Sequence, residues 1–211
     1  MDELELGLED LLIGMPKGVA NMQLPDPCLR DYYRDETNRI FWIDDCVDQP
    51  TLDLVKLIIK CNQADVGKPL EERKRILVMI NSPGGSVEVD QSILGAMKTS
   101  QTPVYTCCYG RAYSAAADIL SCGHKRFALP FTNIMFHAGS GKYEGTQAQI
   151  DSAKKFFDKV NKRINDEVFS HVKFDKKMIK NLKTDDVFMD EEEALKYCVI
   201  DKIIDNFEEL M

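Results

Sequence analysis

The stretch Tyr109-Gly110-Arg111-Ala112-Tyr113-Ser114-Ala115-Ala116-Ala117-Asp118 decides how the chain folds, because a strand passes into a helix within it. It follows Thr102–Cys108, whose β-branched and aromatic residues predict a buried strand, and the alanines after Ser114 have high helix propensity. Ser114 is therefore expected at a helix N-terminus, where unpaired N–H groups and the helix dipole stabilise negative charge beside a reacting oxygen. Serine is also a favoured N-cap, and from this junction alone capping is its more common role.

Units of the same kind lie on both sides of this stretch. Arg75–Ile80 is almost continuously apolar, as in an interior strand covered on both faces. Asn81–Val87 then predicts a sharp turn, and a helix follows near residues 88–99. Further strands are predicted at residues 39–43, 103–108, 126–129, 133–136 and 199–204, and further helices from residue 49, at 114–122 and at 175–183.

Strands that alternate with helices predict an α/β fold with a mixed or parallel sheet and right-handed crossovers. In such a sheet the loops at the C-terminal strand ends gather on one edge. Ser82–Val87 and Gly110–Ser114 are both loops of this kind, so we expect them to face each other. Taken alone, Pro83-Gly84-Gly85 is either an ordinary turn, which is the more common case, or a loop whose amides bind an oxyanion or a substrate.

The search for a general base is short, because the chain has only three histidines. His124 lies in a polar turn, and His171 falls near the C-terminal end of a predicted helix, where a cation complements the dipole. His137 ends a predicted strand and is followed by Gly-rich backbone. His137 is therefore the candidate base, although from the residues alone a purely structural histidine is equally frequent at such a place.

Composition limits the classes of function. The 211 residues are 44% hydrophobic, which suits one domain at residues 31–211 preceded by an irregular extension at 1–30. A formal charge of -8 argues against nucleic-acid binding, and no apolar run is long enough to cross a membrane. Seven cysteines without a CxxC pair predict reduced thiols, no metal site, and a cytoplasmic location or an organelle of similar redox state.

A long amphipathic helix is predicted at about residues 146–172. Its apolar positions follow a three-four spacing: Ile150, Ala153, Phe156, Phe157, Val160, Ile164, Val168 and Phe169. Such a helix either protrudes and packs against a partner subunit or lies across the chain's own core, and the pattern fits both equally well.

Six motifs together resemble, in order and spacing, the proteolytic subunits of the Clp proteases, the ClpP family. They are Ile80-Asn81-Ser82-Pro83-Gly84-Gly85-Ser86-Val87, Gly110-Arg111-Ala112-Tyr113-Ser114, Lys125-Arg126-Phe127-Ala128-Leu129-Pro130, Met135-Phe136-His137, Gly141-Lys142-Tyr143-Glu144-Gly145 and Asp186-Val187-Phe188. The resemblance extends over roughly residues 38–205. It implies an α/β fold of the ClpP/crotonase type, with repeated β-α units and a protruding handle helix at about 146–172.

The resemblance also implies a serine endopeptidase that needs no cofactor or metal at its own active site. By position, Ser114 corresponds to the nucleophile, His137 to the general base and Asp186 to the carboxylate that orients the imidazole. Gly85 and Ala115 correspond to the donors of the oxyanion hole. The backbone expected to pair with an extended polypeptide comprises Gly84, Ser86, Val87, Ala138, Gly139, Ser140 and Gly141.

The implied partners are further copies of the chain, in two stacked heptameric rings around a chamber, and a ring ATPase of the Clp family that unfolds substrates. A non-catalytic ClpP-like subunit of a mixed ring is the alternative, and it predicts a broken triad. A crotonase-type acyl-CoA enzyme would share the fold and the paired amides, but it has no use for a Ser-His-Asp set.

The chain departs from the family's usual residues beside the expected site. Ala115 and Ala116 stand where Met and Gly are usual, and Ala138-Gly139 replaces Gln-Pro. The amide donor of residue 115 is retained, while the pocket beside it is expected to change shape. Asp185 is the neighbouring alternative to Asp186, which we favour for its spacing to Phe188.

Overall fold

A computed structural model describes residues 34–210, and the residues from Arg39 onward form one compact unit. Residues 34–38 are helical. The extension predicted at 1–30 lies outside the described residues. The strands are β1 Ile40–Ile43, β2 Ile76–Ser82, β3 Val104–Tyr113, β4 Lys125–Ala128, β5 Asn133–Phe136, β6 Val187–Asp190 and β7 Lys202–Ile203. The α-helices are α3 Asp53–Ala64, α4 Val87–Thr99, α5 Ala115–Ser121, α6 Gln147–His171, α7 Lys176–Asn181 and α8 Glu191–Lys196, and short 3-10 helices are η1 Gln49–Leu52, η2 Leu70–Glu72 and η3 Phe207–Leu210.

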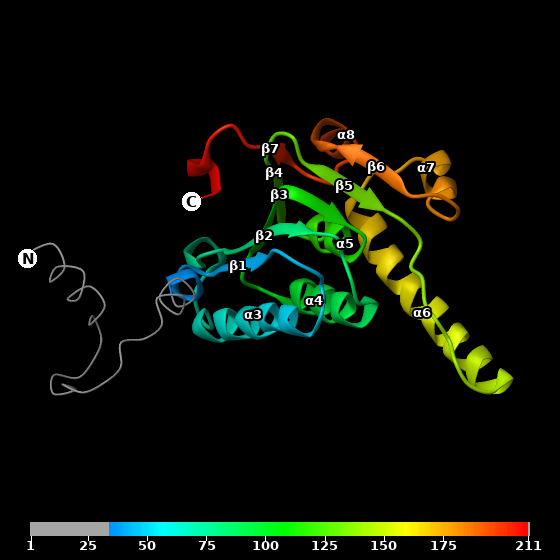
Figure 1. The fold of residues 1–211 in the computed structure, drawn as a ribbon. Coiled ribbons are helices and arrows are strands. Elements are labelled where there is room, and N and C mark those ends of the chain that lie inside the picture. Colours follow the sequence, from blue (N-terminus) through cyan, green and yellow to red (C-terminus); the bar gives the residue numbers. More distant parts are fainter. Residues whose placement is uncertain (1–33, 211) are drawn as a thin grey trace, which may run out of the picture. The chain divides into compact units, whose positions relative to one another are not determined.

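The strands form one mostly parallel sheet in the order β1-β2-β3-β4-β7 (Figure 1). β5 pairs in parallel with β3, and β6 pairs antiparallel with β5. This architecture confirms the predicted α/β fold with a mostly parallel sheet. We call β5 and β6 together the β5–β6 arm. Among the described strands, the arm is joined to the rest of the sheet by three residue pairs between β5 and β3.

β3 is longer than predicted, and this corrects the sequence analysis. Residues 105–108 pair with β4, whereas residues 111–113 pair with β5, so the segment Gly110–Tyr113 that was expected to be a loop continues the strand. The register between β2 and β3 shifts between Ile80 and Ser82. β3 thus exchanges β4 for β5 as its neighbour along its length.

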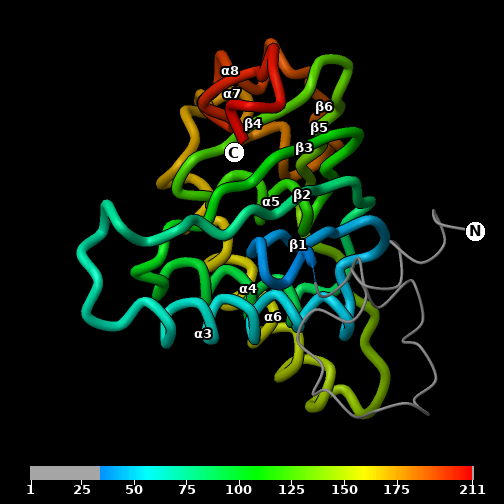
Figure 2. Tube along the Cα trace, turned by 90° about the vertical axis from the view of Figure 1, so that its left-hand side faces the viewer, coloured from blue at the N-terminus to red at the C-terminus, as the bar shows by residue number. Residues whose placement is uncertain are grey.

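The central strands are buried on both faces, as their apolar sequence predicts. Figures 1 and 2 show α3, α4 and α6 on one side of β1, β2 and β3. Ile76, Val78 and Ile80 face the large core on that side. Leu77 and Met79 alternate with them and join a smaller cluster on the other face, together with residues of the C-terminal segment.

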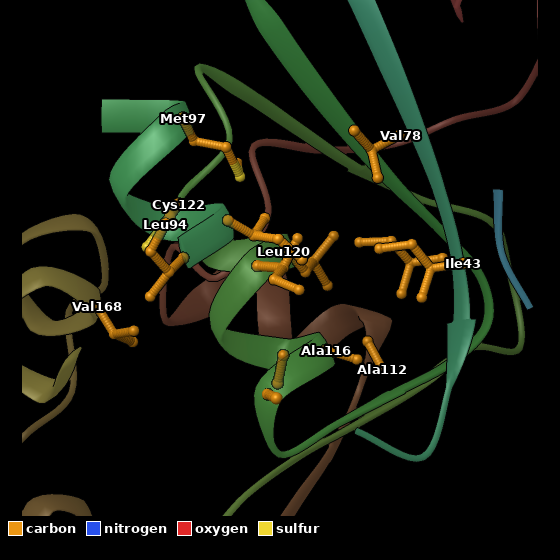
Figure 3. Packing of buried hydrophobic residues seen from close by; sticks show 14 of the residues in the cluster. Ile43, Val78, Leu94, Met97, Ala112, Ala116, Leu120, Cys122 and Val168 are labelled. Carbon is orange, nitrogen blue, oxygen red and sulfur yellow. The ribbon is translucent and has the colours of Figure 1, made fainter. Parts of the chain in front are cut away.

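The large core packs α4 and α5 against the sheet (Figure 3). Met97 from α4, Leu120 from α5 and Val78 from β2 are each at most 1% exposed. Burying a side chain of this size contributes roughly 1.5–3 kcal/mol. This packing fixes the helix that begins directly after Ser114.

The two halves of α6 have different surroundings. A capping box of Thr146 and Gln149 begins the helix. Its buried residues, Val160, Ile164 and Val168, all lie in the C-terminal half, whereas Phe156 is 67% exposed. The C-terminal half lies on the chain's own core and the N-terminal half extends beyond the sheet (Figure 1). Within residues 34–210, no helix combines the length and apolar character needed to span a bilayer.

Candidate active site

Ser114 lies in a strained turn between β3 and α5. Its φ of 56° and ψ of -126° place a non-glycine residue at positive φ, a conformation that costs about 1–3 kcal/mol. Backbone hydrogen bonds hold the turn: Ser114 N–H donates to the Met135 carbonyl at 2.8 Å, and Ala117 N–H donates to the Ser114 carbonyl at 2.8 Å. The Ser114 hydroxyl makes no capping bond to α5. The interpretation of Ser114 as a side-chain N-cap is therefore wrong.

His137 is the histidine that contacts this serine. Its Nε2 lies 2.8 Å from Ser114 Oγ. The parallel pairing of Tyr113 with Met135 brings the ends of β3 and β5 together, and His137 follows β5 directly. The other two histidines have different contacts: His124 accepts a hydrogen bond from Val104 N–H at 3.1 Å, and His171 lies 3.6 Å from Glu167 on its own helix.

Asp186 lies on the opposite side of the imidazole from Ser114. Its Oδ1 is 3.6 Å from His137 Nδ1, and its side chain is 54% exposed. This distance allows an ion pair but is too long for a hydrogen bond. The neighbouring Asp185 instead accepts a hydrogen bond from the Thr184 hydroxyl at 2.9 Å. The geometry thus brings Asp186 rather than Asp185 to the imidazole.

The loop after β2 packs directly against the turn at Ser114, as expected for loops at one edge of the sheet. A Cβ on Gly84, whose φ is +89°, would lie 2.4 Å from the Tyr113 carbonyl oxygen and 2.7 Å from Ser114 Cβ. Glycine is therefore required here both for its backbone conformation and for this close approach.

Two backbone amides beside Ser114 have no hydrogen-bond partner in the part of the chain that the structure describes. Gly85 forms a parallel bridge with Val47, in which Val47 N–H donates to the Gly84 carbonyl and Ser86 N–H donates to the Val47 carbonyl. This pattern turns the Gly85 N–H away from Val47. Ala115 is the first residue of α5, so its N–H has no intrahelical acceptor. Neither amide donates to any group within residues 34–210.

The two segments predicted to pair with substrate differ in how many of their backbone N–H and C=O groups are already used within the chain. Ser86 caps α4 by accepting from Val89 N–H, and Val87 already belongs to that helix. Gly85 is therefore the residue of Gly84–Val87 whose N–H and C=O make no hydrogen bond to any other described residue, which leaves both available to pair with another chain. Ala138, Gly139, Ser140 and Gly141 are exposed and belong to no helix or strand.

Two carboxyl groups near Ser114, one half-buried and one buried, were not predicted from the sequence. Asp118 lies on α5 four residues after Ser114, and Asp90 on α4 is 1% exposed. Burial raises the pKa of Asp118 to about 7. Burial, and to a lesser extent the charge of Asp118, raise the pKa of Asp90 well above its usual range. The sequence does contain a signal for these two groups, because Asp90 and Asp118 each interrupt an otherwise apolar face of a predicted helix.

A family model of known proteins matches this chain. The model is that of the Clp protease, and the match spans residues 56–207. All the site residues described above except Val47 fall inside the matched region.

Proposed function

Because the chain belongs to the Clp protease family, we propose that it is a serine endopeptidase that hydrolyses unfolded polypeptides and peptides. The observation that carries this proposal is the 2.8 Å contact between Ser114 Oγ and His137 Nε2. The contact occurs at a strained turn flanked by the unpartnered amides of Gly85 and Ala115. A nucleophile, a base and a pair of amide donors are what acyl transfer requires.

In the proposed acylation step, Ser114 Oγ attacks the carbonyl carbon of the scissile bond while His137 Nε2 accepts the hydroxyl proton. The substrate oxygen becomes negatively charged and accepts hydrogen bonds from Gly85 and Ala115. The resulting imidazolium then gives its proton to the leaving amine. Water repeats the sequence to hydrolyse the acyl group from Ser114.

Asp186 supplies the orienting carboxylate in this proposal. During proton transfer the imidazole becomes cationic, which strengthens its attraction to a carboxylate. The free-state distance of 3.6 Å then shortens to a hydrogen bond, because catalytic contacts are often long before substrate binds. Asp186 thus favours the tautomer that keeps the Nε2 lone pair directed at Ser114.

The assembly proposed for this chain is a pair of stacked rings that encloses the active sites and receives unfolded substrate from a Clp-type ATPase. Its support is the N-terminal half of α6, which has no buried residue between Gln147 and Lys159 and presents Phe156 to solvent. Tyr143 packs edge-to-face on Phe157 beside it. An exposed apolar helix face of this kind suits burial against another subunit.

Labelling with a fluorophosphonate tests the proposed activity. The reagent forms a covalent bond with a serine oxygen only when that oxygen is activated. We expect one label per chain, located at Ser114 by peptide mass analysis, and none in the Ser114→Ala protein. A native mass measurement of both proteins shows whether they assemble alike. An assembled, unlabelled wild-type protein would instead support the non-catalytic ClpP-like subunit.

A further inference from the structure

A small cavity adjoins the Ser114–His137 pair. Its volume is about 100 Å³, and its lining includes Asp118, His137, Val168, Phe169 and Lys183. A water-sized atom occupies about 10–15 Å³ on this measure, so the cavity holds roughly seven non-hydrogen atoms. It can therefore take one long, unbranched side chain.

Asp118 gives this mostly apolar cavity a carboxyl group. Four residues of helix separate Asp118 from Ser114, a rise of about 6 Å. The Asp118 carboxyl receives no hydrogen bond from any group within residues 34–210. Asp118 is half-buried. A carboxylate that is partly removed from water without a donor is destabilised, so a cation that enters the cavity would stabilise it.

We propose that this cavity binds the substrate side chain on the acyl side of the scissile bond, and that Asp118 selects a lysine or arginine at that position. This inference rests on the proposed peptidase function, because His137 places the cavity beside the carbonyl that Ser114 attacks. The apolar walls contact the methylene groups of such a side chain, and the carboxylate pairs with its charged end.

Within residues 34–210, Asp118 is the one acidic residue that lines this cavity, and the other acidic groups near it do not reach the cavity. Asp90 lies behind Asp118 on α4, and its Oδ1 has no hydrogen-bond partner among the described residues. Cys122, which follows α5 directly, has a pKa raised mainly by burial and stays a neutral thiol. Glu167 on α6 pairs with Lys98.

The cationic groups near Asp118 do not neutralise it. Arg126 is paired with Asp201. Lys183 is exposed and forms no ion pair with Asp118. His137, the remaining titratable neighbour, is directed at Ser114 and Asp186. The carboxyl of Asp118 is therefore left to a group that the substrate brings.

The preference is expected to depend on pH. Burial raises the pKa of Asp118 to about 7, so its carboxyl is mostly protonated at pH 6 and mostly ionised at pH 8.5. Burial and, to a lesser extent, the charge of Asp118 raise the pKa of Asp90, which favours its neutral form. Selection of a cationic side chain should therefore strengthen as the pH rises through 7.

The test compares fluorogenic peptides that differ only at the residue before the scissile bond, which is lysine in one and norleucine in the other. Norleucine keeps the four side-chain carbons of lysine and lacks its terminal ammonium group. The measured quantity is the ratio of kcat/KM for the lysine peptide to kcat/KM for the norleucine peptide. For the full-length assembled protein we expect this ratio to be roughly tenfold or more at pH 8.5 and to fall at pH 6. The ratio cancels any effect of pH on Ser114 and His137.

Three variants sharpen this test. In Asp118→Asn the ratio should fall to one or below and lose its dependence on pH. Lys183→Gln should raise the ratio, since it removes a like charge from the mouth of the cavity. Asp90→Asn should keep the lysine preference and leave its pH midpoint in place, because burial alone raises the pKa of Asp118.

Each outcome separates the inference from the proposed function. If Ser114 is labelled by fluorophosphonate but norleucine is preferred at pH 8.5 in the wild type, the inference is wrong and the peptidase function stands. If Ser114 is not labelled and neither peptide is cleaved, both are wrong. The wild-type ratio decides the inference even where a variant fails to fold.

Discussion

Replacing Gly84 by alanine tests how the site is built. An alanine Cβ there would lie 2.4 Å from the Tyr113 carbonyl oxygen and 2.7 Å from Ser114 Cβ, and the residue has a φ of +89°. An ordinary contact begins near 3.4 Å, so the loop must move by about 1 Å to relieve the clash. A displacement of about 1 Å in a catalytic arrangement costs roughly 100-fold in rate.

We therefore expect Gly84→Ala to lower kcat/KM for a short fluorogenic peptide by roughly 100-fold. The positive φ adds about 1–2 kcal/mol of destabilisation. Thermal unfolding should show this loss as a decrease in Tm of roughly 2–4 °C per kcal/mol.

Gly67 supplies the matched control. Its φ is +82°, and a Cβ there would meet no atom within 4 Å. Gly67→Ala should therefore lower Tm through the backbone conformation while leaving kcat/KM within about twofold of the wild type, since only Gly84 contacts the turn at Ser114. Equal activities in the two variants would refute the packing of the Gly84 loop against Ser114 as the basis of the site.

Three further perturbations have definite outcomes. Asp186→Asn should lower kcat/KM by roughly 100-fold while Asp185→Asn has little effect, since only Asp186 reaches the imidazole; equal losses in peptide hydrolysis would contradict this assignment. Asp65→Asn should cost about 3 kcal/mol in urea unfolding, because it breaks a buried pair with Arg39, and a loss under 1 kcal/mol would contradict the pairing. The Arg39 hydrogen bond holds the pKa of Asp65 well below its usual range. The contribution of this pair to the free energy of unfolding is therefore present above about pH 4 and is lost as the pH falls below it, and Asp65→Asn should lack this dependence on pH. Gly95 is exposed inside α4, and an added Cβ would meet no atom within 4 Å apart from the helix's own backbone. Gly95→Ala should therefore raise the free energy of unfolding by about 0.5–1 kcal/mol, and a decrease in Tm would contradict this open position.

Much of the fold was predictable from the sequence because local patterns determine it. The apolar run of β2 and the three-four spacing of α6 identified both elements and their approximate ends. The alternation of strands and helices predicted the mostly parallel sheet, and hence that the loops near Gly84 and Ser114 would meet. These predictions needed no knowledge of distant contacts.

Features that depend on tertiary pairing were not predictable. The continuation of β3 through Gly110 results from its exchange of β4 for β5, which no local pattern signals. Asp186 was identified by resemblance, because its proximity to His137 depends on the antiparallel pairing of β6 with β5. The position of Asp118 in the lining of a cavity beside His137 follows from the packing of α5 and was equally unpredictable from the sequence.

The β5–β6 arm divides the chemistry of the proposed peptidase between two parts of the molecule. His137 follows one strand of the arm and Asp186 precedes the other, whereas Ser114, Gly85 and Ala115 belong to the main sheet and its helices. A rotation of the arm about the three residue pairs that join β5 to β3 would move His137 and Asp186 together, away from Ser114. The nucleophile and the amide donors would stay in place, so such a motion would switch proton abstraction off while the binding site for a peptide carbonyl remained assembled.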